Sequence, residues 1–253
     1  MRLKRSVIQI FWNYAFTWAI AVFLLIAPTG VTASDRVALV IGNAAYANGP
    51  DLKTPVQDAK VIAKTFEALG YETSVVQNGT KSEILLALAH LRLRSEHAEK
   101  VVVYFAGHGV LLDGMSFVVP SDAKFSETNL AKDLIPMNVV VRAISDQPRQ
   151  KIIFFDACRD NPIYKSTSVK KQISTRSFNP AGLFVLYSSQ PGAFAFDGID
   201  DVSPFARAVI DHAGKDKNIE VLAKRIRLDV LRSTHGQQLP WSKSSLLRPA
   251  FLN

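Results

Sequence analysis

The only cysteine of the chain, Cys158, is the residue with the clearest capacity for chemistry. It lies in KIIFFDACRDN (Lys151–Asn161), where an apolar run ends in polar residues. One cysteine cannot form an internal disulfide, so its free thiol is either buried and inert or kept for its reactivity. Because a thiol has an ordinary pKa of about 8.5, it needs a nearby base to act as a nucleophile at neutral pH.

His108 is the candidate for that base. It stands between two glycines in VVVYFAGHGV (Val101–Val110), at the end of a second apolar run. An imidazole can take up the thiol proton and later return it to a leaving amine. The backbone N–H groups of Gly109 and Cys158 are candidate donors of an oxyanion hole, since such donors stabilise the negative oxygen formed in acyl transfer. A lone cysteine or histidine is more often structural, so the prediction depends on the two segments together.

These segments require a scaffold that brings two strand ends together. Beyond residue 33, β-branched runs alternate with amphipathic segments, which is typical of a mostly parallel sheet flanked by helices. In such a sheet functional groups gather beyond the carboxyl ends of the strands, so His108 and Cys158 are expected at one edge. The predicted strands are 36–41, 71–77, 100–107, 151–156 and 182–189, and the predicted helices are 54–70, 80–94, 139–144, 203–213 and 219–233.

Local signals refine this arrangement. Two helices are expected to start with capping boxes, Thr54 with Gln57 and Thr80 with Glu83. A hairpin is predicted around Gly114. Residues 159–179 are rich in Lys and Arg and have little hydrophobic periodicity, which predicts an exposed basic loop.

The first 33 residues are distinct from the rest. MRLKR precedes a long apolar stretch, and small residues follow at VTA, which is typical of a secretory signal peptide cut after Ala33. The alternative is an uncleaved membrane anchor, because the apolar stretch is long enough to span a bilayer. On either interpretation residues 34–253 form a single exported domain, periplasmic or secreted, which contacts the membrane only if the leader is retained.

Charge and motif content exclude several classes of function. Without the three basic residues of the leader, the formal net charge of +8 falls to +5. The sequence has neither an Arg/Lys stripe interleaved with aromatics nor a zinc-ligand spacing, so neither nucleic-acid binding nor a metal site is predicted. The absence of a G-x-S-x-G motif argues against an α/β serine hydrolase.

Several segments together resemble the caspase-like cysteine peptidases, and within them the metacaspase and orthocaspase branch of bacteria. The segments are RVALVIGNAAY, PVQDA, VVVYFAGHGV, FFDACRDNP and VLYSSQPG, and the resemblance covers nearly all of 36–253. It implies a three-layer α/β/α sandwich around a sheet of about six strands. It also implies that Cys158 is the nucleophile and His108 the catalytic histidine of a cysteine endopeptidase.

The resemblance further implies cleavage after Arg or Lys in a peptide or protein substrate. Asp58 and Asp156 match the acids that line the pocket for this basic residue in relatives. Two partly buried carboxylates favour a cationic side chain and reject an acidic one. The alternative is structural, with Asp58 stabilising the first turn of its helix and Asp156 capping a strand end. Asp197 falls in a loop that shapes the substrate cleft in relatives.

The sequence departs from the family pattern at three positions. Arg159 and Asp160 replace the usual His-Ser, and Gln57 replaces an Asn, which puts calcium activation in doubt; no calcium ligand is assigned and no other cofactor is expected.

The basic loop offers three candidate sites of self-cleavage, Lys170, Lys171 and Arg176. The alternative function is a catalytically inactive caspase-like domain, an exported module that binds peptides or proteins along its cleft and sheet edge.

Overall fold

The computed structural model describes residues 34–112, 114–124, 130–144, 150–158, 180–193, 195–198, 201–215 and 218–253. These residues fall within one compact unit, 33–253. The predicted leader (1–33) and the predicted basic loop (159–179), with its three candidate cleavage sites, lie outside the described residues. No helix within the described ranges is long and apolar enough to cross a membrane.

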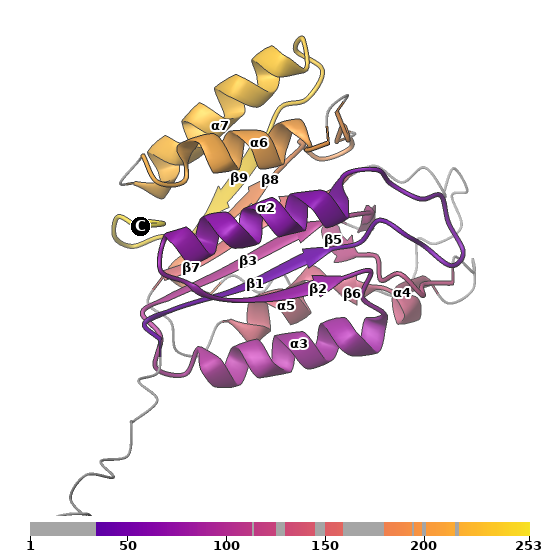
Figure 1. Ribbon diagram of the computed structural model, residues 1–253, viewed down its shortest axis with the longest axis horizontal. Coiled ribbons are helices and arrows are strands. Elements are labelled where there is room, and N and C mark those ends of the chain that lie inside the picture. The colour runs from indigo at the N-terminus through magenta and orange to yellow at the C-terminus, as the bar shows by residue number, and fades with distance from the viewer. Residues whose placement is uncertain are drawn as a thin grey trace, which may run out of the picture. The chain divides into compact units, whose positions relative to one another are not determined.

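A six-stranded sheet in the order β2-β1-β3-β7-β8-β9 forms the centre of the domain (Figure 1). Its strands are β1 (Arg36–Gly42), β2 (Glu72–Gln77), β3 (Lys100–Ala106), β7 (Gln150–Asp156), β8 (Leu183–Tyr187) and β9 (Trp241–Ser244). All neighbours pair in parallel except β8 and β9, which are antiparallel. Every residue of β3 is buried, as expected of a strand covered on both faces. The predicted sheet is confirmed, although β9 was not predicted.

Helices cover both faces of this sheet (Figure 1). The helices are α2 (Pro55–Ala68), α6 (Pro204–His212) and α7 (Ile219–Ser233) on one face, and α3 (Lys81–Arg94) and α5 (Met137–Ala143) on the other. Side chains alternate between the two cores: Tyr104 and Phe154 pack under α2 and α6, whereas Phe105 and Phe155 face α3 and α5. The three-layer α/β/α architecture is therefore confirmed.

A second, smaller sheet follows His108. It comprises β4 (Gly109–Leu112), β5 (Met115–Val118) and β6 (Ile135–Pro136), with the short helix α4 (Leu130–Asp133) before β6. The predicted hairpin is present, and Gly114 takes a positive φ of 78° at its turn. Neither α4 nor β6 was predicted.

The two predicted capping boxes have different outcomes. The box of Thr80 and Glu83 is formed at the start of α3. The box of Thr54 and Gln57 is wrong, because Thr54 makes no side-chain cap bond at the start of α2. The Thr54 side chain instead lies beside the carboxyl of Asp58 and acts to lower its pKa.

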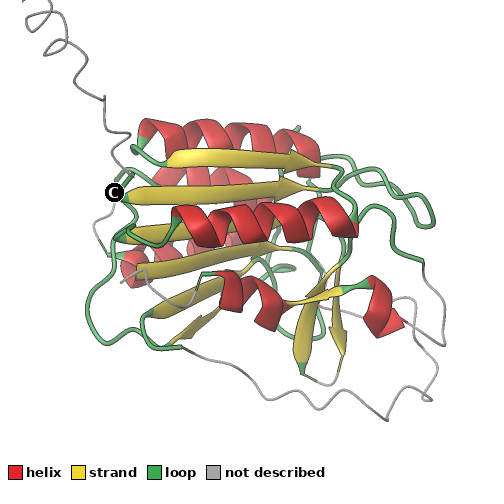
Figure 2. Ribbon diagram, turned by 90° about the horizontal axis from the view of Figure 1, so that it is seen from below, coloured by secondary structure: helices red, strands yellow, loops and turns green. Residues whose placement is uncertain are grey.

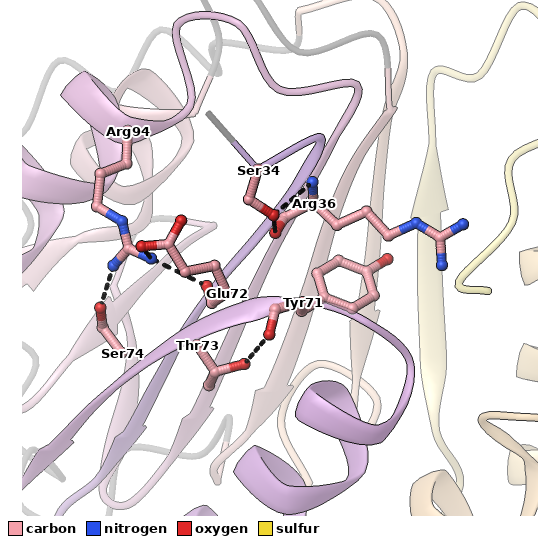
Figure 3. Close-up of polar contacts among 7 residues, drawn as sticks. All are labelled: Ser34, Arg36, Tyr71, Glu72, Thr73, Ser74 and Arg94. Carbon is pink, nitrogen blue, oxygen red and sulfur yellow. Dashed lines mark hydrogen bonds and ion pairs between the residues drawn. The ribbon is translucent and has the colours of Figure 1, made fainter. Parts of the chain in front are cut away.

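Polar contacts join neighbouring elements at the edge where the parallel strands begin, called here the N-terminal edge (Figure 3). Arg94, at the end of α3, pairs with Glu72 at 2.5 Å and bonds Ser74 Oγ at 2.5 Å, which ties α3 to β2. Nearby, the Tyr71 hydroxyl donates to the Leu252 carbonyl at 2.7 Å, and Lys100 Nζ donates to the Asn253 carbonyl at 2.5 Å. The opposite edge, called the C-terminal edge, carries the candidate site.

Candidate active site

His108 and Cys158 lie at equivalent positions beyond two paired strands. In the β3–β7 pair Ala106 lies opposite Asp156, so each candidate residue follows that last pair by two positions. Both side chains line a small cavity of about 70 Å³ at the C-terminal edge. The loops that follow the parallel strands lie on the right of Figure 2. The sequence prediction that the two side chains share one edge is therefore met by their placement.

A backbone carbonyl orients the imidazole of His108. Nε2 lies 2.8 Å from the carbonyl oxygen of Pro50. A carbonyl only accepts hydrogen bonds, so Nε2 must carry the hydrogen and donate it. In the neutral ring Nδ1 is then the basic nitrogen. This tautomer follows from the hydrogen-bond partner, and sequence reasoning could not identify it because Pro50 contributes no side-chain group.

Tyr46 contacts the same histidine through its hydroxyl and its ring. The backbone N–H of His108 donates to the Tyr46 hydroxyl at 2.7 Å, and that hydroxyl donates to the Asn43 carbonyl at 3.1 Å. The two rings are in contact, with centroids 4.5 Å apart. Gly107 has to be a glycine at this point, since it takes a φ of 152° and a Cβ there would lie 2.7 Å from the Tyr46 hydroxyl. Burial raises the pKa of Tyr46, so the hydroxyl stays protonated.

The thiol of Cys158 is half-buried, and Ala195 of a distant loop is among the residues that it contacts. The backbone N–H of Ala195 donates to Sγ at 3.3 Å, and Sγ lies 3.6 Å from the carbonyl oxygen of Ala195. An N–H donor stabilises a thiolate more than a thiol. The sulfur therefore sits in the wall of the cavity, in contact with the backbone of the segment 195–198.

The N–H of Gly109 points away from the strand that pairs with it. Val119 donates its N–H to the His108 carbonyl at 3.1 Å, which makes Gly109 and Val118 a non-hydrogen-bonded pair of the β4–β5 ladder. A Cβ on Gly109 would lie 2.9 Å from the Cys158 carbonyl oxygen. Glycine thus permits β4 to approach Cys158 closely, and the two proposed oxyanion donors lie on adjacent backbone.

Asp58 and Asp156 line the cavity from two elements, α2 and β7. Asp156 follows Phe154 on the face of β7 that packs under α2 and α6. Asp58 lies in the first turn of α2, which starts close to the end of β1. A Cβ on Gly42 would lie 2.3 Å from the Pro55 carbonyl oxygen, so a larger residue would push α2 away.

Ser203, the N-cap of α6, connects the two acids. Its N–H donates to Asp58 Oδ1 at 2.9 Å, and its hydroxyl donates to Asp156 Oδ2 at 2.6 Å. The Tyr104 hydroxyl also donates to Asp156 Oδ2, at 3.2 Å. Both acids are almost fully buried, with 1% and 6% of their surface exposed. The sequence predicted Ser203 as a helix start but not as the link between these carboxylates.

The carboxyl pair has unusual acidity. Burial, and after it the charge of Asp156, raises the pKa of Asp58 to about 7. Burial raises the pKa of Asp156 to about 6, although the hydrogen bond from Ser203 lowers it. A group whose charged form is destabilised in this way gains from a cation placed beside it. The cavity floor is therefore suited to a positively charged side chain.

Asp197 lies at the boundary between this cavity and a larger one. Its carboxylate accepts the N–H of Lys53 at 3.3 Å. Asp197 and Phe196 line both the small cavity and a neighbouring pocket of about 710 Å³ beside α6 and α7. Of the residues predicted from sequence, His108, Cys158, Asp58, Asp156 and Asp197 thus line one cavity. Within the described part of the chain, no three His, Cys, Asp or Glu side chains are grouped as a metal-binding set.

Comparison with known proteins gives matches over the same region. A family model described as "Caspase domain" matches residues 35–251. The chain is 27% identical over 220 residues to the mucosa-associated lymphoid tissue lymphoma translocation protein 1 of Homo sapiens, and equally to its homolog in Mus musculus. The alignments cover 85% of this chain but only 26% of each relative, so the chain spans about a quarter of their length.

Proposed function

Since the chain belongs to the caspase-domain family, we propose that it is a cysteine endopeptidase in which Cys158 is the nucleophile and His108 the base. Membership of the family, predicted from the sequence motifs, is confirmed by the match over 35–251. One observation carries the proposal for the reaction. His108 and Cys158 line the same cavity from neighbouring strand ends, and the Pro50 carbonyl leaves Nδ1 of the imidazole as the basic nitrogen.

In the proposed reaction Cys158 Sγ attacks the carbonyl carbon of the scissile peptide bond, and Nδ1 of His108 takes the thiol proton. The N–H groups of Gly109 and Cys158 donate to the oxygen that becomes negative. Collapse of this intermediate breaks the C–N bond, and the imidazolium protonates the departing amine. Water then hydrolyses the thioester with His108 as the base, which regenerates the thiol.

The proposed specificity is for Arg or Lys on the carbonyl side of the scissile bond. The buried Asp58 and Asp156 support it, because a guanidinium or ammonium group would pair with them and favour their ionised forms. An Asp side chain there would add a third acid to a site in which negative charge is already destabilised. This specificity, and the metacaspase-type branch that implies it, remain proposals.

Two observations favour the alternative of an inactive peptide-binding domain. Ala195 contacts Cys158 Sγ with both its N–H and its carbonyl group, and the cavity of about 70 Å³ is far smaller than the ~300 to 1,000 Å³ of most ligand pockets. An active enzyme therefore has to move the segment 195–198 when substrate binds. Such adjustment on binding is common, and retention of the oriented histidine favours the enzyme.

The deciding experiment is cleavage of a peptide library by the purified chain, with and without calcium. We expect cleavage after Arg and Lys, and a loss of at least about 10³-fold in kcat/KM in Cys158→Ala and in His108→Ala. The matched control is His90→Ala, which alters an exposed histidine of α3 and should leave kcat/KM unchanged.

Several outcomes of this experiment would contradict the proposal. Cleavage only after Asp would refute the acidic pocket. Binding of peptides without cleavage in either condition would establish the alternative. The calcium arm tests activation, for which no ligand set is assigned. Export remains a prediction from residues 1–33, to be checked by N-terminal sequencing of the mature protein.

A further inference from the structure

The segment Ala195–Gly198, called here the cleft loop, determines what can reach the sulfur of Cys158. Ala195 contacts Sγ through its N–H at 3.3 Å and its carbonyl oxygen at 3.6 Å. The next two residues, Phe196 and Asp197, form the wall shared by the small cavity and the larger neighbouring pocket. A rotation of this backbone would therefore change both the cover over the sulfur and the shape of the two cavities.

Gln238 holds the cleft loop from a distant part of the chain. Its side-chain Oε1 accepts the N–H of Phe196 at 3.0 Å, and its Nε2 donates to the carbonyl of Ser188, just beyond β8, at 2.9 Å. The residue is completely buried, with 0% exposed surface. Its own N–H donates to Thr234 Oγ1 at 3.0 Å, and Thr234 is bonded to Val230 of α7 at 2.7 Å. The side-chain amide of Gln238 thus links the cleft loop to the end of β8, and its backbone N–H links the residue to the end of α7.

The geometry of one peptide group connects Gln238 to the nucleophile. The N–H that Phe196 donates to Gln238 and the carbonyl of Ala195 that faces Cys158 belong to the same peptide unit. A peptide unit is planar and almost always trans, so its C=O and N–H point in opposite directions. Fixing the N–H on Gln238 therefore fixes the direction of the carbonyl toward Sγ.

We propose that Gln238 is a positioning residue of the peptidase, which sets the Ala195–Phe196 peptide group and with it the cleft loop against Cys158. The proposal rests on the proposed function for its effect on peptide cleavage, but not for its effect on the thiol. Gln238 touches neither the sulfur nor the acid pair in the structure described here, and acts through the loop. Its role was not visible in the sequence, because both of its side-chain partners are backbone groups far away along the chain.

The test compares Gln238→Met with the matched control Gln237→Met. Methionine has a similar length but offers no amide, so the Phe196 N–H loses its acceptor, whereas Gln237 is exposed. The first measurement is the rate of Cys158 alkylation by iodoacetamide at pH 9.5, above the ordinary thiol pKa of about 8.5, which requires no peptidase activity. We expect a rate at least about threefold higher in Gln238→Met and an unchanged rate in the control, since a displaced loop uncovers the sulfur.

The second measurement is the kinetics of peptide cleavage. We expect KM to fall at least about threefold in Gln238→Met with kcat within about threefold of the starting value, because the segment that substrate must displace is no longer held while His108 and Cys158 stay in place. Gln238→Glu keeps an acceptor for the Phe196 N–H but loses the donor to Ser188 and adds a buried charge, so its alkylation rate should also rise above that of the unaltered protein. An alkylation rate in Gln238→Met no higher than in the Gln237→Met control would overturn the proposal.

Hydrogen exchange keeps the proposal testable if Gln238→Met fails to fold. In the unaltered protein the amide of Phe196 should exchange more slowly than the other amides of residues 195–198. Exchange as fast as theirs, or a folded Gln238→Met with unchanged alkylation and KM, would refute the role of Gln238. If the unaltered protein cleaves no peptide, the proposed function fails, while alkylation and exchange still decide the positioning role.

Discussion

The parallel strands begin and end among polar side chains, but the two edges of the sheet use them differently. At the N-terminal edge, Arg94 pairs with Glu72 (Figure 3). The Tyr71 hydroxyl donates to the Leu252 carbonyl. These contacts join opposite charges, or a donor and an acceptor. At the C-terminal edge, two acids are buried next to each other, and burial raises the pKa of both.

The difference indicates which edge is built for a ligand. Contacts that pair donors with acceptors stabilise the fold and need nothing further. The carboxylates of Asp58 and Asp156, both hydrogen-bonded to Ser203, instead lower the stability of the fold when they ionise. Such a loss of stability is expected where a group serves binding or catalysis. Removal of a buried acid at the C-terminal edge should therefore raise stability and lower activity, whereas removal of a paired group at the N-terminal edge should lower stability and leave activity unchanged.

Among the variants that compare the two edges, the largest effect is expected from Asp58→Asn. The change removes one of the two carboxylates that would face a bound Arg or Lys, so kcat/KM for such peptides should fall by about 10² to 10³, chiefly through KM. The measurement is the steady-state kinetics of an Arg peptide. The control at the other edge is Asp35→Asn, an exposed acid, which should leave kcat/KM unchanged. Equal activity of both variants would mean that Asp58 has only a structural role in α2.

The next effect concerns stability against pH. The pKa of Asp58 is raised to about 7 in the folded protein, while an unfolded chain ionises this acid at about 4. Between these values the unfolded state releases protons that the folded state keeps, so the free energy of unfolding falls as pH rises from about 4 to about 7. We expect Asp58→Asn to match the unaltered protein at pH 4 and to be more stable by a few kcal/mol at pH 8.

Urea unfolding across this pH range provides the measurement. Asp35→Asn should keep the slope of the unaltered protein. If Asp58→Asn is less stable at pH 8 than the unaltered protein, ionisation of the acid pair does not lower the free energy of unfolding. The contrast drawn between the two edges would then be wrong.

The sequence predicted the positions of the reactive side chains well because strand ends have a strong signature. An apolar run that stops at GHG or DACRD places His108 and Cys158, and parallel pairing then brings them to one edge. The pairing of Asp58 and Asp156 came only from the resemblance to a family. Their link through Ser203 depends on how α6 packs, which no local pattern records.

Contacts to backbone groups account for what the sequence missed. The Pro50 carbonyl and the partners of Gln238 have no side-chain signature, so neither spacing nor residue type identifies them. The wrong capping box at Thr54 has a different cause. The local rule assigns its hydroxyl to the helix backbone, but in the folded chain the Thr54 side chain lies beside the carboxyl of Asp58.

A smaller effect is expected from a pair of tyrosine variants, one at each edge. Tyr46→Phe removes the acceptor of the His108 N–H, and Tyr71→Phe removes the donor to the Leu252 carbonyl. Each should cost about 1 to 3 kcal/mol of stability, because a buried polar group loses its partner. Only Tyr46→Phe should also lower kcat, by about tenfold, since a tilted imidazole presents Nδ1 less well to the thiol. Thermal unfolding and kcat measured on both variants separate the two roles, and an equal kcat would remove Tyr46 from the positioning of His108.

The smallest effect is expected from Glu72→Gln at the N-terminal edge. The change keeps the side-chain length but removes the charge that faces Arg94, in an ion pair whose two side chains are 55% and 29% exposed. A pair this exposed contributes at most about 1 kcal/mol, and salt screens it. Urea unfolding should therefore show a small loss at low ionic strength that disappears near 1 M salt, with kcat/KM unchanged. Glu67→Gln, an exposed acid of α2, should show no loss in either condition. A fall in kcat/KM with Glu72→Gln would show that the N-terminal edge influences the site. It would contradict the assignment of stability to the N-terminal edge and of ligand binding to the C-terminal edge.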